Sequence, residues 1–320
     1  MKRALALFAA LLLFPLGAMA ETFGDYTYEL AEDGAVITDY KTDDIPQTLI
    51  LPSYINGHPV VSIGRNALNN SENAWDGDKV ITLILPSTLQ RVEEEAFQCC
   101  HSVGTIVFPA SIEVIPEGCF SHVTAQILVD AMNPWYTVQD GCLIDLRTQT
   151  LLYSAWREEN TEVTLPHVKR IGEGGLENLC SASGFVLPDT LHSIGPYAFY
   201  GCSILELSIP DSVTVLDEYA LSYIEELQRV RLPRNLTELP AYCFQYSRLQ
   251  EIEIPQSVTS IGEYAFEGAR FTSVTLPALV SFVGYGAFDD DVIITSLNPN
   301  VHFETEEEFD QRMEEDTGED

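Results

Sequence analysis

The stretch LQEIEIPQSVTSIGEYAFEGA, residues 249–269, is the unit from which most of this chain is built. A further copy, FTSVTLPALVSFVGYGAFDD, starts 22 residues later at Phe271, and copies with the same pattern start at Leu227 and Ile204. Self-similarity at a fixed period of about 20–50 residues is typical of a solenoid, in which each unit stacks on its neighbours. The repeat therefore predicts one stacked array, although length alone would suggest about two domains.

The residue types of the unit predict its local structure. The alternating segment IEI at 252–254 is typical of a short strand with one buried face. Pro255 should end that strand, because proline has no N–H to extend the ladder. We expect Val258 and Ile261 to point inward on the return path, and Gly262 to let the chain bend where a side chain would crowd.

The pair Ala265-Phe266 should pack a small and a large residue on the far side of each coil. Stacked repeats would bring the equivalent residues into one column of the core. This predicted column comprises Phe97, Phe120, Phe199, Phe244, Phe266 and Phe288, with Leu68, Leu176 and Leu221 in the same slot.

The pattern IxIPxSVxxIGxxAFxxC resembles the BspA-type leucine-rich repeats of bacterial surface and secreted proteins. The copies that carry the resemblance are LSIPDSVTVLDEYALSYI, IEIPQSVTSIGEYAFEGA and FVLPDTLHSIGPYAFYGC, and the likeness extends from about Tyr26 to Phe303. It implies an α/β repeat fold: a right-handed, curved leucine-rich-repeat solenoid with a concave parallel β-sheet and short helical turns or coil on the convex side. It also implies a binding scaffold whose partners vary.

The first 20 residues have the features of a secretory signal peptide. Lys2 and Arg3 precede an apolar run over residues 4–16, and Ala18-Met19-Ala20 supplies a small-x-small cleavage site. The run is shorter than a membrane span requires, and the later sequence holds no stretch apolar enough to span a membrane. We therefore expect cleavage after Ala20 and a mature chain that is secreted, periplasmic or displayed at the cell surface.

Both ends of the repeat array carry signals of their own. Segments 26–30 and 35–37 alternate around Glu32-Asp33-Gly34, which predicts a β-hairpin that caps the first coil. We assign residues 21–303 to the solenoid and 304–320 to an acidic tail. Thr305 and Glu308 form a capping box there, which predicts a short helix to about residue 315.

The period breaks once, at a β-rich insertion over residues 133–156. Three short β-like runs, at 136–138, 142–145 and 150–154, are separated by turn residues. In the resembled family such an insertion begins with Asn-Pro and contains Asp-Gly-x-Leu, which match Asn133-Pro134 and the segment DGCLI here.

The formal net charge of −33 limits the classes of partner. So acidic a surface repels nucleic-acid phosphates and anionic lipid heads, and favours basic or neutral partners. We therefore expect no nucleic-acid partner.

The seven cysteines are odd in number and follow the repeat, which argues against a disulfide framework. Cys100 and Cys202 lie three residues after the core phenylalanine, while Cys119 and Cys243 replace the small residue before it. We expect buried thiols at these positions. Cys180 and Cys202 are one repeat apart but are offset by one slot, so we predict that both stay reduced.

Motifs for nucleotide binding, nucleophile elbows and zinc proteases are absent from the sequence. Asp289-Asp290-Asp291 lacks the spacing and glycine of a calcium loop, so a solvated turn is the better interpretation. One set of soft ligands clusters in adjacent repeats and is compatible with zinc, although core cysteines beside a surface histidine explain it more simply. The set comprises Cys99, Cys100, His101, Cys119 and His122. We predict no metal and no cofactor.

Candidate partner-binding residues come from the strand pattern. Residues two and four before each repeat proline should point away from the core, onto the concave face. In the N-terminal half this places Ile50, Ile84 and Val107 on that face, with Trp75 at its rim; in the C-terminal half it places Arg229 and Arg231 between acidic residues. Exposed apolar neighbours often mark an interaction site. The alternatives are strand propensity for the apolar set and a cross-strand charge ladder for the arginines.

These observations predict an exported, non-catalytic binding or adhesion protein that presents its repeat surface to a protein or a glycan. Two alternatives stay open: a structural component of a cell-envelope assembly, and an enzyme whose site lies in residues 125–156. Nothing in the sequence sets the oligomeric state.

Overall fold

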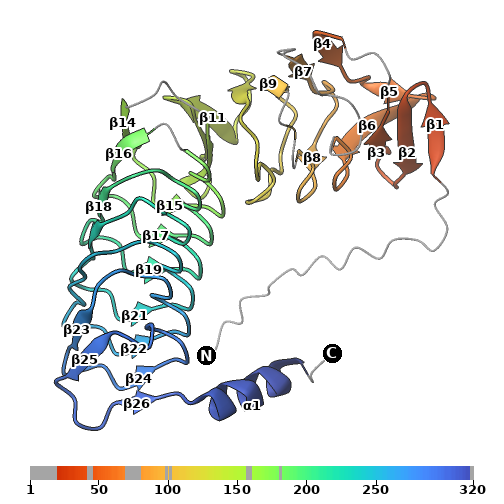
Figure 1. The fold of residues 1–320 in the computed structure, drawn as a ribbon. Helices are drawn as coiled ribbons and strands as arrows, with labels where there is room; N and C mark the ends of the chain where they lie inside the picture. Colours follow the sequence, from red (N-terminus) through yellow and green to blue (C-terminus); the bar gives the residue numbers. More distant parts are fainter. Residues whose placement is uncertain are drawn as a thin grey trace, which may run out of the picture.

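The computed structural model is a solenoid of stacked coils, as the repeat predicts (Figure 1). The structure describes residues 20–41, 46–68, 81–97, 100, 103–155, 161–179 and 182–317. Within these ranges strands dominate, and one α-helix follows the last coil. Figure 1 shows that the coils form an arch, which bends where the chain passes from β11 (Tyr136–Gln139) to β14 (Thr161–Thr164).

One row of strands, termed the proline row, is formed by the segments before the repeat prolines and their equivalents. Neighbouring strands pair in parallel, and the row consists of four separate sheets. The strand predicted at residues 252–254 is wrong, because no strand forms there, although Ile254 is buried as expected. In Figure 1 the row follows the outer edge of the arch, so the prediction that these strands face the concave side is wrong. It comprises β4 (Thr48–Ile50), β7 (Ile81–Ile84), β9 (Val103–Phe108), β10 (Gln126–Val129), β14, β16 (Ala182–Val186), β18 (Glu206–Ser208), β20 (Arg229–Arg231), β23 (Ser273–Leu276) and β25 (Ile293–Ser296).

A second row, termed the glycine row, is formed by the short strands just before the repeat glycine and their equivalents. A Cβ on Gly262, which follows the strand at 260–261, would lie 2.3 Å from the Ala241 nitrogen of the adjacent coil, so a side chain does not fit there. The row comprises β6 (His58–Ile63), β8 (Arg91–Val92), β15 (Arg170–Ile171), β17 (Ser193–Ile194), β19 (Val215–Leu216), β21 (Glu238–Leu239), β22 (Ser260–Ile261), β24 (Phe282–Val283) and β26 (His302–Phe303).

The predicted hairpin caps the first coil. Strands β2 (Tyr26–Leu30) and β3 (Ala35–Tyr40) pair antiparallel, and β3 pairs in parallel with β6 of the glycine row. Two strands that we did not predict add to this cap: β1 (Glu21–Phe23) pairs with β2, and β5 (Tyr54–Ile55) forms a hairpin with β6.

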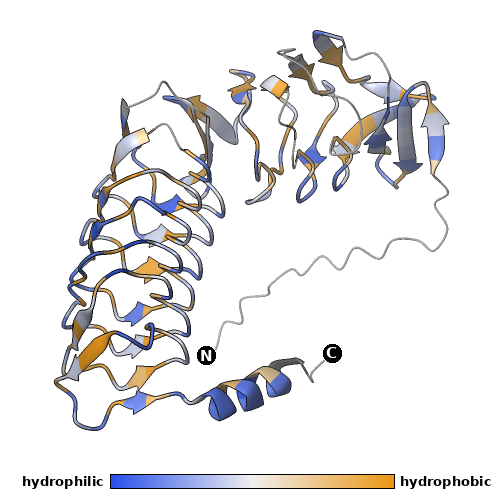
Figure 2. Cartoon of the chain, viewed as in Figure 1, coloured by the Kyte–Doolittle hydropathy of each residue, from blue (hydrophilic) through white to orange (hydrophobic). Residues whose placement is uncertain are grey.

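The core contains the predicted column of large side chains. Every phenylalanine and leucine assigned to it is buried. Phe266 stacks between Phe244 and Phe288, with ring centroids 5.4 and 5.3 Å apart. The backbone reinforces the stacking, because the Phe266 N–H donates to the carbonyl of Ala287 in the next coil (2.9 Å). Figure 2 shows the resulting alternation of hydrophobic and hydrophilic residues along the coils.

The insertion joins two hydrophobic cores. Its strands β11, β12 (Cys142–Asp145) and β13 (Thr150–Ser154) lie where the sequence predicts them and pair antiparallel in that order. β13 then pairs in parallel with β15, which resumes the glycine row. Leu143 packs into the N-terminal core and Ile144 into the C-terminal core, so adjacent residues of β12 serve the two halves.

Helix α1 (Glu306–Thr317) follows the last strand. The predicted capping box is present: the Thr305 N–H donates to Glu308 (2.8 Å), and the Glu308 N–H donates to the Thr305 hydroxyl (3.3 Å). The helix is mostly hydrophilic (Figure 2), and it packs on the last coils through Phe309 and Arg312.

The cysteines at repeat positions are buried, as expected: Cys100, Cys119, Cys202 and Cys243. The Cys100 thiol donates to the Leu68 carbonyl and the Cys202 thiol to the Leu176 carbonyl, both at 3.1 Å. Burial raises the pKa of the Cys119 and Cys243 thiols, which keeps them protonated. Cys180 lies outside the described residues, so the reduced state of Cys180 and Cys202 stays a prediction.

The candidate zinc ligands are not brought together by the part of the chain that the structure describes. Cys99 and His101 lie outside it. His122 is directed toward Glu177, with 3.4 Å between Nδ1 and a carboxylate oxygen. Among the described residues, no three His, Cys, Asp or Glu side chains form a group that would hold a metal ion.

Candidate functional site: the outward faces of the coils

Four apolar side chains form a line on the outward face of the proline row in the N-terminal half. Ile50 is opposite Ile84, Ile84 opposite Val107, and Val107 opposite Leu128, on strands β4, β7, β9 and β10. Because side chains alternate along a strand, the preceding residues point into the core. Those inward residues are Leu49, Leu83, Ile106 and Ile127, all buried. We term Ile50, Ile84, Val107 and Leu128 the apolar ladder.

The apolar ladder is open to solvent. Ile50 is 63% exposed and Leu128 is 42% exposed. Ile84 and Val107 are half-buried, since each has a neighbouring strand on both sides. Strand propensity alone explains β-branched residues here but gives no reason for a large exposed side chain at both ends. The structure thus brings the three apolar candidates together and adds Leu128.

Leu128 was missed by the sequence analysis because its strand is not followed by a proline. The segment after β10 is DAMNP, in which the proline comes too late, so counting back two residues from it does not reach Leu128. The spacing of the preceding coils would have found it. Trp75, predicted at the rim, lies outside the described residues, and that placement stays a prediction.

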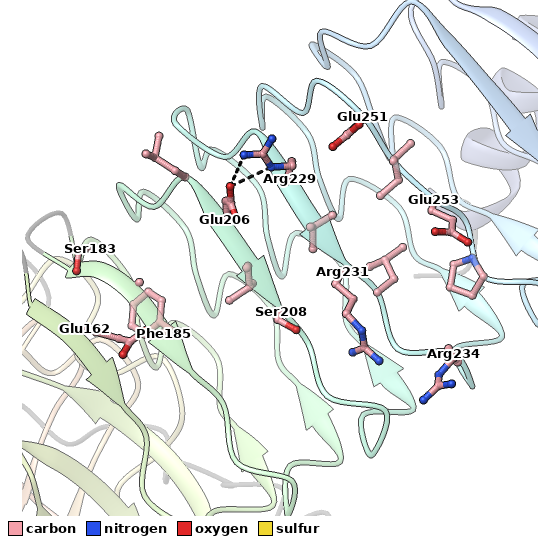
Figure 3. Close-up of a pocket in the computed structure, with 17 residues that line it drawn as sticks. Glu162, Ser183, Phe185, Glu206, Ser208, Arg229, Arg231, Arg234, Glu251 and Glu253 are labelled. Atoms are coloured by element: carbon pink, nitrogen blue, oxygen red, sulfur yellow. Dashed lines mark hydrogen bonds and ion pairs between the residues drawn. The ribbon is translucent and has the colours of Figure 1, made fainter.

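The arginine candidates lie elsewhere, in an open groove of about 1290 Å³ on the proline row of the C-terminal half (Figure 3). Arg229 and Arg231 are on β20, which pairs with β18. Arg229 donates to Glu206 on the opposite strand, with 2.9 Å from Nε. Arg231 donates to the Ile209 carbonyl (2.8 Å) and to Asp211 (2.9 Å). Arg229 is thus part of a cross-strand ion pair, whereas Arg231 pairs with the turn after β18.

Asp211 is the anchor of this turn. Hydrogen bonds from Arg234, and from Arg231, lower its pKa to about 2. The carboxylate stays ionised throughout the physiological range, so both arginines keep their partner. The candidates Arg229 and Arg231 are therefore less available to a ligand than the apolar ladder, because an incoming anion would have to displace their ion pairs with Glu206 and Asp211.

The coils also carry two rows of tyrosines that the sequence analysis did not single out. Tyr197, Tyr219, Tyr242 and Tyr264 stack in sequence, with centroid distances of 4.8, 4.5 and 5.3 Å. A second row comprises Tyr200, Tyr223 and Tyr246. We term both rows together the tyrosine flank. The signal was available: tyrosine recurs two residues before the core phenylalanine or leucine in four consecutive repeats.

The insertion contains a polar cluster in which Asp145 and Tyr136 are buried and Arg147 is exposed. Arg147 donates to Asp145 (2.6 Å) and to the Tyr136 hydroxyl (2.7 Å), and its guanidinium lies 5.3 Å from the Trp135 ring centre. Burial would raise the pKa of Asp145, but hydrogen bonds from Arg147 outweigh it and hold the pKa below the usual value. A carboxylate held in its ionised form by an arginine is a weak proton acceptor.

Comparison with known proteins identifies the repeat. The family model for the BspA type leucine rich repeat region matches residues 54–151 and 161–295, with six copies. The chain belongs to the BspA-type leucine-rich repeat family. Between the two matched segments lies the end of the insertion, where the repeat pattern is interrupted.

Solved structures share the fold of this BspA-type chain. The pneumococcal vaccine antigen PcpA is similar at 11% identity and a TM-score of 0.50, over 91% of this chain and 89% of that one. A leucine rich cell surface protein from Faecalibacterium prausnitzii is 17% identical with a TM-score of 0.41, over 92% of this chain and 97% of that one. At such low sequence identity, these similarities show a shared fold and nothing about function. A comparison with curated proteins gives no match.

In the described ranges of this BspA-type chain, no helix combines the length and hydropathy needed to cross a bilayer.

Proposed function

We propose that this protein is exported and binds a protein partner through the apolar ladder, without catalysis. One observation carries the proposal: Ile50, Ile84, Val107 and Leu128 lie in register on four paired strands, with both ends of the line well exposed. Contiguous apolar side chains on a rigid sheet are the usual centre of a protein interface.

The chemistry of the ladder favours a protein over a glycan. Its side chains are hydrocarbon, and the parallel line beside it comprises Thr48, Thr82, Thr105 and Gln126. Such a surface offers apolar contact and a few hydrogen-bonding groups, which suits the apolar side chains of a protein. A glycan partner is one of the outcomes that the test below separates.

Export is supported by the leader sequence and by the first strand. Residues 1–20 combine basic residues, an apolar run and a small-x-small site, as a signal peptide requires. Strand β1 begins at Glu21, the first residue after the proposed cleavage site, and it pairs with β2 of the cap. Cleavage after Ala20 would therefore leave the cap complete and place the mature protein at the cell surface, in the periplasm or outside the cell.

The two alternatives make different demands. The polar cluster does not favour an enzyme in residues 125–156, because Asp145 and Tyr136 both hydrogen-bond with Arg147. A structural envelope component would be retained by the cell wall with or without the ladder. The binding proposal instead requires that loss of the apolar ladder reduces the capture of a partner protein.

The test is capture of partners by the mature chain, residues 21–320, immobilised and exposed to solubilised surface proteins of host and microbial cells. We expect Ile50→Glu combined with Leu128→Glu to reduce the amount of captured protein at least about tenfold, because two charges placed in an apolar interface cost more than about 1.4 kcal/mol. Ile50 and Leu128 are chosen over Ile84 and Val107 because the latter are half-buried, and a charge there would also disturb folding.

Ile293→Glu is the matched control. Ile293 is 69% exposed and also lies on the outward face of the proline row, but on β25 in the other half. The Ile293→Glu variant should capture as much partner protein as the unmodified chain does, and all variants should give the same circular dichroism spectrum. Equal capture by the ladder variant and the control would overturn the proposal. Treatment of the lysate with glycosidases separates a glycan partner, whose capture would then be lost.

A further inference from the structure

The tyrosine flank ends in a small pocket. The first stacked ring is Tyr197, and in the coil before it the equivalent position is Gly174, which has no side chain to continue the stack. The gap is a pocket of about 220 Å³, lined by His122, Glu173, Gly174, Glu177, Tyr197 and Tyr200, among others. It is smaller than a typical site for a small molecule, so its size suits one side chain.

Gly174 and the tyrosines share a backbone conformation. Gly174 has φ +61°, and Tyr197 has φ +53°. One face of the Tyr197 ring is covered by Tyr219, at a centroid distance of 4.8 Å and an interplanar angle of 15°. The other face borders the gap at Gly174. The pocket therefore offers an open aromatic face, which attracts cations through its quadrupole.

Two carboxylates line the same pocket. Glu177 accepts a hydrogen bond from Asn178 (3.0 Å) and lies 3.4 Å from His122. The Glu173 N–H donates to Glu117 (2.9 Å), which brings a further carboxylate close to Glu173. Burial raises the pKa of Glu173 and Glu177, and the neighbouring Glu117 adds to the effect on Glu173. A cation in the pocket would relieve this repulsion.

The chain already fills two arrangements of this kind with its own arginines. At the other end of the tyrosine flank, Arg312 lies 5.2 Å from the Phe309 ring centre and pairs with Glu263 and Glu304. In the insertion, Arg147 lies over Trp135 and pairs with Asp145.

At the pocket, the aromatic face and the carboxylates are present without such an arginine. Of the described residues, no arginine or lysine forms an ion pair with Glu173 or Glu177: Arg170, the basic residue nearby, pairs instead with Glu117 (3.5 Å) and Asp217 (3.1 Å). The described part of the chain thus supplies the aromatic face and the carboxylates of the arrangement but not the arginine.

We propose that this pocket is a second binding site, which takes an arginine side chain of a partner protein between Tyr197, Tyr200 and the carboxylates of Glu173 and Glu177. Arginine fits better than lysine because its planar guanidinium stacks on a ring while donating to carboxylates. The strongly acidic chain would also attract a basic partner segment over a distance. The site does not include the apolar ladder, so it stands or fails independently of the proposed function.

The test uses blocked single residues as probes. The mature chain is labelled with ¹³C on its tyrosine rings and titrated with Nα-acetyl-arginine-N-methylamide, with Nα-acetyl-citrulline-N-methylamide as the uncharged analogue of the same shape. We expect saturable shifts of the Tyr197 and Tyr200 signals with the arginine probe and none with citrulline. Glu173→Gln should weaken binding about fivefold, as loss of about 1 kcal/mol from a partly exposed ion pair predicts.

Glu225→Gln is the matched control, because it removes the same charge from a neighbouring part of the surface where Glu225 already pairs with Arg248 (3.2 Å). Binding of the arginine probe should be unchanged in this variant and in Ile50→Glu. Equal shifts with arginine and citrulline, shifts that do not saturate, or equal effects of Glu173→Gln and Glu225→Gln would each refute the site.

Discussion

Phe266→Ala is expected to lower the free energy of unfolding by about 3–5 kcal/mol, the range for removal of a buried phenylalanine. Phe266 is fully buried, and its ring stacks on those of Phe244 and Phe288 in the adjacent coils. Truncation would leave a cavity in the middle of the column. In a solenoid each coil is stabilised by its neighbours, so the cavity weakens two interfaces at once. Denaturant unfolding followed by circular dichroism measures the loss.

Two further variants test whether the loss of stability is specific to the core column and not a general effect of substitution in this part of the solenoid. Phe266→Leu should cost less than about 1.5 kcal/mol, because leucine already occupies the same slot at Leu176 and Leu221. Leu279→Ala should change stability by less than about 0.5 kcal/mol, because Leu279 is exposed. A loss below about 1 kcal/mol for Phe266→Ala would show that the repeat register is wrong.

Asn133→Ala is expected to lower the free energy of unfolding by about 2–4 kcal/mol, because it leaves several buried polar groups without hydrogen-bond partners. The Asn133 side chain is buried and ties the insertion to the coil before it. Its amide donates to the carbonyls of Ile112 (2.8 Å) and Ala110 (3.2 Å), and its oxygen accepts from the N–H groups of Trp135 and Tyr136 (both 2.8 Å). Alanine replaces none of these bonds, and water has little access.

Asn298→Ala is the matched control, at the second Asn-Pro pair of the chain. Asn298 donates to the Val280 carbonyl (2.7 Å) and accepts from the Asn300 N–H (2.9 Å), but it lies half-buried at the end of the solenoid. Water can satisfy the groups that it leaves, so we expect a loss of about 1 kcal/mol in thermal or denaturant unfolding. If Asn133→Ala and Asn298→Ala lower the free energy of unfolding by the same amount, the Asn133 side chain does not join the insertion to the solenoid.

The repeat made the fold predictable because each structural role recurs with one residue type. A proline ends the outward segment of most coils, as Pro277 does after β23, and Phe266 and its equivalents fill the core slot. The Asn133-Pro134 pair marked the start of the insertion, but the sequence could not show that the asparagine side chain bonds to the preceding coil, since those contacts are long-range.

The sense of the curvature was predicted wrongly, because we expected the proline row on the concave face of the arch. The arch bends at the insertion, where β12 contributes adjacent residues to two separate cores, so its shape depends on how three strands pack and not on the repeat. The proline row follows the outer edge of the whole arch in Figure 1, and the groove near Arg229 is a local hollow in it. The repeat defines each coil but not the angle between the two halves.

The candidate surfaces were predictable only in part. Ile50, Ile84 and Val107 follow from counting back from the proline, whereas Leu128 has no proline to count from. Tyr197 and its stacked partners adopt positive φ, a conformation that favours glycine or asparagine. Asn66 and Glu95, at the equivalent position of other coils, also have positive φ, so the turn of the coil imposes this conformation. The gap at Gly174 becomes visible only once the stack of rings is seen.

Hydroxyl-radical footprinting of the mature chain, alone and with its captured partner bound, tests most directly the claim that the apolar ladder is the binding surface. Mass spectrometry would measure the oxidation of individual side chains. We predict that Ile50 and Leu128 lose most of their reactivity in the complex, while Ile293 and Leu279 at the other end of the solenoid keep theirs. Unchanged oxidation of Ile50 and Leu128 beside a partner that protects another face would contradict the account.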